Sequence, residues 1–202
     1  MKQSAPSALR NRGPLLEVLR RVWPPTGTVL EIASGTGEHI TFFAQQLSSL
    51  SFQPSDIDAT ARASVDAWRD ELALTNVHAA LALDARDDAW PIADASIDAM
   101  LNINMIHISP WSATLGLMRH ASRVLKNGAP LVTYGPYLQK DVLTAPSNVA
   151  FDESLRARNV EWGVRKLDVV VAAARDHGMS LEEVVAMPAN NLCVVLRNTS
   201  KR

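Results

Sequence analysis

The chain has 202 residues, of which 47% are hydrophobic and 20% are charged, and its formal net charge is −1. This composition is typical of a soluble globular protein, and the near-neutral charge argues against a nucleic-acid or anionic-membrane binder. The one cysteine, Cys193, excludes an internal disulfide and a cysteine metal cluster, and its apolar neighbours predict a buried structural thiol. Neither an apolar span nor a signal-peptide core occurs, so we expect one domain over residues 1–202 that is soluble and cytoplasmic.

Hydrophobic periodicity and turn residues divide the chain into alternating helices and strands. Residues 1–9 look loose, and Pro14 opens the first helix, which Pro24 and Pro25 end. This order of strand–helix units, closed by a hairpin, predicts an α/β fold with a mostly parallel seven-stranded sheet and helices on both faces. The predicted helices cover about 14–22, 40–47, 59–74, 112–125 and 167–174, and the predicted strands cover about 28–32, 50–56, 77–83, 97–103, 131–134, 181–187 and 192–197.

The apolar pattern weakens between the fifth predicted strand and the last predicted helix, over residues 135–165. A connection of this length in a compact domain is usually a lid or a binding segment. We therefore expect residues 135–165 to form a substrate lid.

A glycine turn follows the first strand, in the sequence LEIASGTGEH over residues 30–39. Gly35 and Gly37 permit backbone angles that other residues disfavour, and they let a ligand approach the main chain closely. A strand, a glycine turn and a helix in this order bind nucleotide-like cofactors. The nicotinamide pattern G-x-G-x-x-G requires a small residue where this chain has the large Ile40, which disfavours that cofactor. No phosphate-cradling G-x-x-x-x-G-K-[ST] motif occurs.

Acidic residues stand at the ends of the first three predicted strands, namely Glu31, Asp56 and Asp84. Because ligands of such sheets bind at the carboxyl ends of the strands, these carboxylates should gather there. S-adenosylmethionine has no phosphates, but it carries a ribose diol, an adenine amino group and a cationic sulfonium, all of which carboxylates bind favourably. The pattern therefore favours S-adenosylmethionine as the cofactor.

The chain also resembles the class I S-adenosylmethionine-dependent methyltransferases, and more closely the methyltransferase-like family known as domain of unknown function 938. The resemblance covers nearly the whole chain and implies a Rossmann-like class I methyltransferase fold. One departure is Ala33, which stands where the usual pattern has the first glycine of the turn. The resemblance is carried by RNR (10–12), LEIASGTGEH (30–39), QPSD (53–56), NINMIHISPW (102–111), YGPY (134–137), Asn148 with Phe151 and Asp152, WGVR (162–165) and MPANN (187–191).

The resemblance implies functions for residues at matching positions. Glu31, Ala33 and Gly35 would line the methionine part of the cofactor, and Asn102 would meet the methionine end after the fourth strand. The full expected cofactor set is Arg12, Glu31, Ala33, Ser34, Gly35, Gly37, His39, Asp56, Ile57, Asp84, Ala85, Asn102 and Met105.

The adenosine part would be bound by residues that follow the second and third strands. Asp56 would hold the ribose, with Ile57 beside the adenine, and Asp84 with Ala85 would bind the adenine edge. His39, in the first turn of the cofactor helix, is expected to pack or to contact the cofactor.

His107 lies just past the fourth strand, where acceptor and cofactor should meet, and it is the candidate general base. The alternative is that His107 only orders the loop that runs through Ser109, Pro110 and Trp111. No histidine or carboxylate cluster has metal-ligand spacing, so no metal is expected. The expected acceptor-binding set is Asn104, His107, Trp111, Tyr134, Tyr137, Asn148, Trp162, Arg165, Asn190 and Asn191.

The acceptor itself is indicated only broadly. The N-P-P-Y motif of amino-group methylation is absent, and NMIH (104–107) stands in its place. Together with the neutral charge, this disfavours a nucleic-acid substrate, and we expect in-line methyl transfer to a small molecule. The alternatives are a non-catalytic S-adenosylmethionine-binding protein that acts through a protein partner and, more remotely, an oxidoreductase. No membrane partner and no particular oligomeric state are implied.

Overall fold

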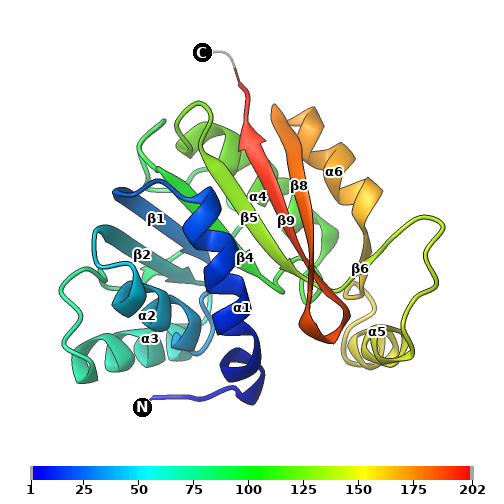
Figure 1. The fold of residues 1–202 in the computed structure, drawn as a ribbon, viewed down its shortest axis with the longest axis horizontal. Helices are drawn as coiled ribbons and strands as arrows, with labels where there is room; N and C mark the ends of the chain where they lie inside the picture. Colours follow the sequence, from blue (N-terminus) through cyan, green and yellow to red (C-terminus); the bar gives the residue numbers. More distant parts are fainter. Residues whose placement is uncertain (1, 201–202) are drawn as a thin grey trace.

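The computed structural model describes residues 2–200, apart from the side chain of Ser7, and Figure 1 shows how its elements are arranged. None of the helices in this range combines the length and the hydropathy that a bilayer crossing requires. The helices are α1 (Pro6–Val22), α2 (Glu38–Gln46), α3 (Ala59–Glu71), α4 (Trp111–Val124), α5 (Pro146–Arg158) and α6 (Leu167–Asp176), with a short 3₁₀ turn at Pro188–Asn190. The strands are β1 (Gly27–Ile32), β2 (Leu50–Asp56), β3 (Leu81–Ala82), β4 (Ala99–Ile103), β5 (Pro130–Gly135), β6 (Tyr137–Leu138), β7 (Arg165–Lys166), β8 (Met179–Met187) and β9 (Asn191–Asn198).

Seven of these strands form one sheet in the order β3-β2-β1-β4-β5-β9-β8. The first five pair in parallel, and β9 runs antiparallel between β5 and β8. The strand order reverses between β1 and β4, which is where open α/β sheets leave a crevice at the carboxyl ends of their strands. The predicted seven-stranded, mostly parallel sheet with a terminal hairpin is therefore confirmed.

The central strands are apolar on both faces because helices cover both faces. In β1, Leu30 and Ile32 pack in a cluster with α4 and α6, whereas Val29 packs in a second cluster with α1, α2 and α3. Ile40 is 1% exposed within this second cluster, as its place on the apolar helix face predicts. Cys193 is buried in the same cluster, which confirms the expected structural thiol.

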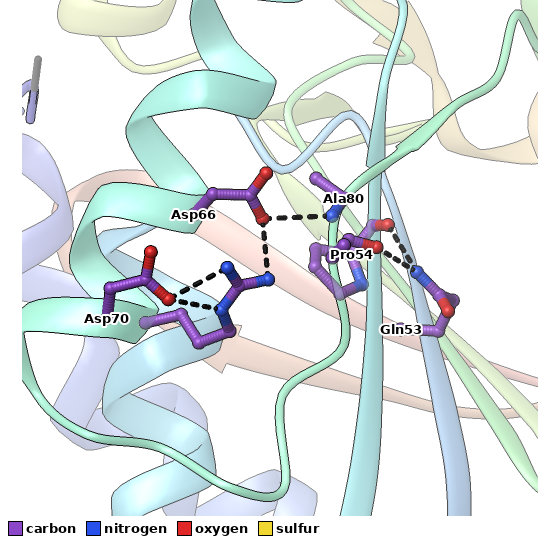
Figure 2. Close-up of polar contacts among 7 residues, drawn as sticks. Gln53, Pro54, Asp66, Asp70 and Ala80 are labelled. Atoms are coloured by element: carbon purple, nitrogen blue, oxygen red, sulfur yellow. Dashed lines mark hydrogen bonds and ion pairs between the residues drawn. The ribbon is translucent and has the colours of Figure 1, made fainter.

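The strand predicted over 77–83 is mostly replaced by an edge loop, because side chains satisfy its backbone. Only Leu81–Ala82 pairs with β2 as a strand, and Val77 forms an isolated parallel bridge with Phe52 of β2. Asp66 of α3 accepts from the Ala80 N–H at 3.1 Å, and the Gln53 amide donates to the Ala79 carbonyl at 2.9 Å (Figure 2). These contacts replace ladder bonds that a longer strand would have made.

The N-terminal segment is ordered earlier than the sequence predicts, because α1 begins at Pro6. The Gln3 N–H donates to the Ser64 hydroxyl at 2.8 Å, and the Ser4 hydroxyl donates to the Glu38 carboxylate at 2.9 Å. These polar contacts tie the segment to α2 and α3 without any apolar pattern, so the expectation of a loose segment is wrong for residues 3–9. Residue 1 lies outside the described range.

Residues 135–165 contain a helix, α5, that the apolar pattern does not reveal. Only Asn148 and Leu155 of α5 are buried, so the helix lacks a continuous apolar stripe. At either end of the segment, β6 and β7 pair in parallel as a separate two-stranded sheet. Figure 1 shows α5 next to the turn that joins β8 and β9.

Candidate functional site

A cavity of about 520 Å³ opens at the carboxyl ends of β1, β2 and β4, which is where the sequence predicts a ligand. Another hollow, of about 400 Å³, lies at the amino ends of β1 and β2 beside Trp23 and Leu50, and it contains no predicted site residue. Of the expected cofactor residues, those that line the first cavity are Ala33, Gly35, Asp56, Ile57, Asp84, Ala85 and Met105, and Trp162 of the expected acceptor set lines it too.

The turn after β1 takes left-handed backbone angles at three positions, with φ of +60° at Ala33, +56° at Gly35 and +89° at Gly37. Such angles strain a residue that has a Cβ, so Ala33 adopts a conformation that glycine usually provides. A Cβ on Gly37 would lie 2.8 Å from Cα of Val65, whereas a Cβ on Gly35 would meet nothing within 4 Å. Gly37 therefore allows α2 and α3 to pack closely, and Gly35 leaves the cavity wall free of a side chain.

Asp56, at the end of β2, holds the glycine turn in place. Its carboxylate accepts from the Gly35 N–H and from the Asp58 N–H, each at 2.9 Å. Ser34 joins the same two elements, because its N–H donates to the Ser55 carbonyl at 2.8 Å. A carboxylate has about four lone-pair positions, so Asp56 retains acceptor capacity towards the cavity.

Asp84, after β3, is paired with Arg86. The two side chains form an ion pair at 2.6 Å, and the Arg86 N–H also donates to Asp84 at 2.8 Å. The hydrogen bond from the Arg86 side chain is the main cause that lowers the pKa of Asp84. Asp84 is therefore ionised, and its charge is balanced within the cavity wall.

Two expected cofactor residues, Glu31 and Asn102, are buried with unsatisfied oxygens. Glu31 is 2% exposed and its Oε2 has no partner within residues 2–200. Asn102 donates to the Ile32 carbonyl at 3.0 Å, but its Oδ1 accepts no hydrogen bond in the described chain. Burial raises the pKa of Glu31 to about 7, while a hydrogen bond from Ser34 opposes the rise.

The Glu31→Gln variant tests this burial through pH. A carboxyl whose folded pKa of about 7 exceeds its ordinary 4.5 stabilises the fold at low pH, and this contribution is lost as the pH rises through 7. Since an amide does not titrate, the stability of the variant relative to wild type should rise across that window by up to roughly 3 kcal/mol. Denaturant unfolding of ligand-free protein at the two ends of the window measures this change. A pH-independent difference would contradict it.

His107 is fully buried and does not line the cavity. Its carbonyl accepts from the Gly163 N–H at 2.9 Å, its Nδ1 accepts from the Arg165 N–H at 3.3 Å, and its ring meets that of Tyr137 edge-on. A Cβ on Gly135 would lie 2.6 Å from Nε2, so glycine leaves the room that the imidazole occupies. Burial lowers the pKa of His107 to about 3. This geometry matches the alternative in which His107 only orders its loop. The imidazole does not reach the cavity wall, where a general base would have to act.

Arg165 joins the loop after β4 to the segment after α5. Its guanidinium donates to the carbonyls of Ile106 at 3.2 Å, Ser109 at 2.8 Å and Glu161 at 2.6 Å. It also lies 5.8 Å from the centre of the Trp111 ring. Because Ser109 and Glu161 both line the cavity, the hydrogen bonds of Arg165 hold this part of the cavity wall together.

Arg12, His39 and Tyr134 also lie outside the cavity lining. Arg12 stacks on an aromatic ring of α2, and His39 Nε2 lies 2.7 Å from Oδ1 of Asn11. Burial lowers the pKa of His39 to about 4, so the neutral ring donates this hydrogen bond. The Tyr134 hydroxyl is buried without a hydrogen-bond partner in the described chain, and burial raises its pKa.

The expected acceptor residues do not form one site. A second cavity of about 230 Å³ is lined by four of them, Tyr137, Asn148, Asn190 and Asn191, and it shares no lining residue with the first cavity. No three His, Cys, Asp or Glu residues within 2–200 are grouped to hold a metal ion. The expected acceptor residues that line neither cavity are Asn104, His107, Trp111, Tyr134 and Arg165.

Some cavity residues were missed by the sequence reasoning, among them Arg86, Ile108, Asn159 and Glu161. Arg86 could have been found from its place two residues after Asp84, where a turn brings opposite charges together. Asn159 and Glu161 follow a helix that the sequence pattern did not reveal, so no comparable signal pointed to them.

A family model described as "Protein of unknown function (DUF938)" matches residues 2–198 of the chain. Solved structures with the same fold are methyltransferases by name. An O-methyltransferase family protein from Burkholderia thailandensis is 16% identical with a TM-score of 0.79, and the match covers 94% of this chain and 57% of that one. An O-methyltransferase family 2 protein from Planctomyces limnophilus, solved with apigenin, is 16% identical with a TM-score of 0.80 and coverages of 95% and 58%.

A geranyl diphosphate C-methyltransferase from Streptomyces coelicolor, solved with S-adenosylhomocysteine, is 12% identical with a TM-score of 0.74, and the match covers 94% of this chain and 81% of that one. This chain therefore spans little more than half the length of the two O-methyltransferases. At these identities the matches establish the fold, which is the Rossmann-like class I methyltransferase fold.

Proposed function

We propose that this chain, which belongs to the family described as "Protein of unknown function (DUF938)", is a methyltransferase that uses S-adenosylmethionine and acts on a small molecule. The observation that carries the proposal is the charge of the larger cavity, where three carboxylates (Asp56, Asp84 and Glu161) stand against one guanidinium (Arg86). A net negative wall favours a sulfonium and an ammonium group. Because Arg86 is paired with Asp84, no described lining residue offers an unpaired cation to a phosphate.

The lining residues also fit S-adenosylmethionine in their chemistry. Asp56 keeps acceptor capacity for the hydroxyls of a ribose, and Ile32, Leu83 and Met105 provide apolar walls for an adenine. Glu31 does not line the cavity, but it directly precedes the lining residues Ile32 and Ala33, and we assign its unpartnered Oε2 to the methionine ammonium group. The lining carboxylates and the apolar slot support this ligand over a polyphosphate cofactor, because the carboxylates repel phosphate groups.

When bound, S-adenosylmethionine supplies a sulfonium methyl group that an acceptor nucleophile displaces in line. The contribution of the chain is to position the two reactants and to exclude water. Trp162 and Asn159 line the cavity from the segment after α5, and Arg165 fastens that segment to the loop after β4. We assign the lid function to this part of residues 135–165, and we assign no proton transfer to the buried His107.

Release of S-adenosylhomocysteine from S-adenosylmethionine in the presence of fractionated small-molecule cell extracts tests the activity. We expect at least one fraction to accelerate the release above the rate without extract. The Asp56→Ala variant serves as the inactive control, because it loses the carboxylate that orders the glycine turn. If no fraction raises the release by a protein that binds the cofactor, the catalytic proposal fails.

A second candidate is a non-catalytic S-adenosylmethionine-binding protein that acts through a protein partner. Exposed apolar side chains in the 135–165 segment favour it, since Val142 is 55%, Leu143 96% and Val149 44% exposed. This candidate predicts saturable cofactor binding without release by any extract. Binding and release measured on the same preparation separate the two candidates.

A further inference from the structure

The second cavity is lined by residues of the 139–145 segment, the start of α5 and the turn that joins β8 and β9, and Figure 1 shows α5 next to this turn. Its volume is about 230 Å³, and none of its lining residues carries a charge. Its polar groups include the amides of Gln139, Asn148, Asn190 and Asn191 and the Thr144 hydroxyl, and Leu143 is among its apolar ones. A cavity with polar but uncharged walls selects a ligand by hydrogen bonding rather than by charge.

The three asparagines that line this cavity donate hydrogen bonds from their side-chain amides to neighbouring protein groups. Asn148 donates to the Asn190 carbonyl at 2.9 Å, and Asn190 donates to the Ser147 hydroxyl at 3.1 Å. Asn191 donates to the Pro188 carbonyl at 3.1 Å. Within residues 2–200 the side-chain oxygens of these asparagines accept no hydrogen bond. The donors hold the turn against α5, and the acceptors remain available to a ligand.

We propose that this cavity holds the recognition end of the methyl acceptor, and that this end is an uncharged group with N–H or O–H donors, such as a carboxamide. The inference rests on the proposed function, because it takes the occupant to be the acceptor. Tyr137 lines the second cavity and packs on His107, at 4.7 Å between ring centroids. His107 lies in the same loop as Met105, which lines the first cavity, so this loop joins the walls of the two cavities.

Charged ends fit this cavity poorly. An anion would face three carbonyl oxygens without a neighbouring cation, and desolvating it there is unfavourable. A cation would find carbonyl oxygens but no carboxylate among the lining residues, so it would lose hydration without gaining an opposite charge. An uncharged donor satisfies the carbonyl oxygens and leaves no unpaired charge, while its hydrocarbon part can pack on Leu143.

Ligand-observed NMR titration of the full chain with three probes of similar size tests the proposal. The probes are benzamide, benzoate and benzylammonium. We expect benzamide to bind in the millimolar range and at least about tenfold more tightly than either charged probe. Asn148→Asp replaces one amide by a carboxylate of the same shape, so benzylammonium should then bind more tightly than benzamide. Asn127→Asp adds the same charge at an exposed turn outside both cavities, and it should leave the order unchanged.

Equal or tighter binding of a charged probe to the wild type, or no binding of any probe, would overturn the proposal. An unchanged order in Asn148→Asp would also overturn it, because the probes would then bind elsewhere. Titration of S-adenosylhomocysteine into the same samples separates this inference from the proposed function. If the protein binds S-adenosylhomocysteine but a charged probe binds as tightly as benzamide, only the proposed class of acceptor is rejected. If benzamide binds most tightly but S-adenosylhomocysteine does not bind, the proposed methyltransferase function is rejected.

Discussion

Replacement of Asp56 by alanine is expected to lower the affinity for S-adenosylhomocysteine by at least about 100-fold, because charge-assisted hydrogen bonds contribute roughly 1.5–3 kcal/mol each. The bond from the Gly35 N–H holds the glycine turn to the end of β2, and the bond from the Asp58 N–H orders the residues that follow β2. The variant loses these bonds and the acceptor that Asp56 presents to the cavity. Titration calorimetry on protein whose circular dichroism matches the wild type measures the loss.

Asp66→Ala is the matched control, because it removes the same side chain from a site away from the cavity. Asp66 bonds the Ala80 N–H at 3.1 Å and Arg69 at 3.0 Å (Figure 2), and it does not line the cavity. We expect a loss of about 1 kcal/mol in folding stability and an unchanged affinity. If the two variants lowered the binding affinity equally, Asp56 would act through folding stability alone. That result would contradict the assignment of Asp56 to the cofactor site.

Gly116→Ala is expected to lower folding stability by about 2–4 kcal/mol, since overpacking that displaces backbone costs this much. Gly116 lies in α4, and a Cβ there would stand 1.9 Å from the carbonyl oxygen of Ala85. Ala85 lines the larger cavity, so its displacement should also weaken binding of S-adenosylhomocysteine. Thermal unfolding should show a melting temperature lower by roughly 5–15 °C.

Gly13→Ala is the control for this second prediction, because Gly13 is also helical but nothing lies within 4 Å of its added Cβ. Alanine is the better helix former, but a Cβ on the residue before Pro14 disfavours helical angles. We therefore expect a change within about 1 kcal/mol and no change in cofactor affinity. A Gly116→Ala protein as stable as Gly13→Ala would mean that α4 does not rest on the Ala85 backbone.

The sheet was predictable because its central strands are apolar runs bounded by turn residues, and parallel strands covered on both faces have that pattern. Prediction failed where polar side chains replace backbone pairing. The segment around Ala80 is held by Asp66 and Gln53, and no periodicity records such contacts. It failed again for α5, whose only buried residues are Asn148 and Leu155.

The candidate site was predictable where it depends on strand ends. The glycine turn, Asp56 and Asp84 line one cavity because the carboxyl ends of parallel strands meet at one edge of the sheet. The placement of His107 depends on the room left by Gly135 and on Arg165, which come from distant parts of the chain. The sequence therefore indicated where His107 stands along the chain but not that its ring is buried.

The position of Trp162 in the wall of the larger cavity likewise depends on tertiary structure. Trp162 was expected in the acceptor site, whereas it lines the cavity that contains Asp56. This position follows from the course of the chain after α5 and from the bonds that Arg165 makes to Ser109 and Glu161. Asn148, at the start of α5, lines a second cavity, so the expected acceptor residues are divided among the first cavity, the second cavity and positions that line neither.

The central claim is that the larger cavity binds S-adenosylmethionine, and titration calorimetry of the wild-type chain tests it most directly. S-adenosylhomocysteine and oxidised nicotinamide adenine dinucleotide are titrated separately into the same preparation. The negative cavity wall and the absence of an unpaired lining cation predict one saturable site for S-adenosylhomocysteine and no heat from the dinucleotide. Binding of the dinucleotide, with no heat from S-adenosylmethionine or S-adenosylhomocysteine, would contradict the account.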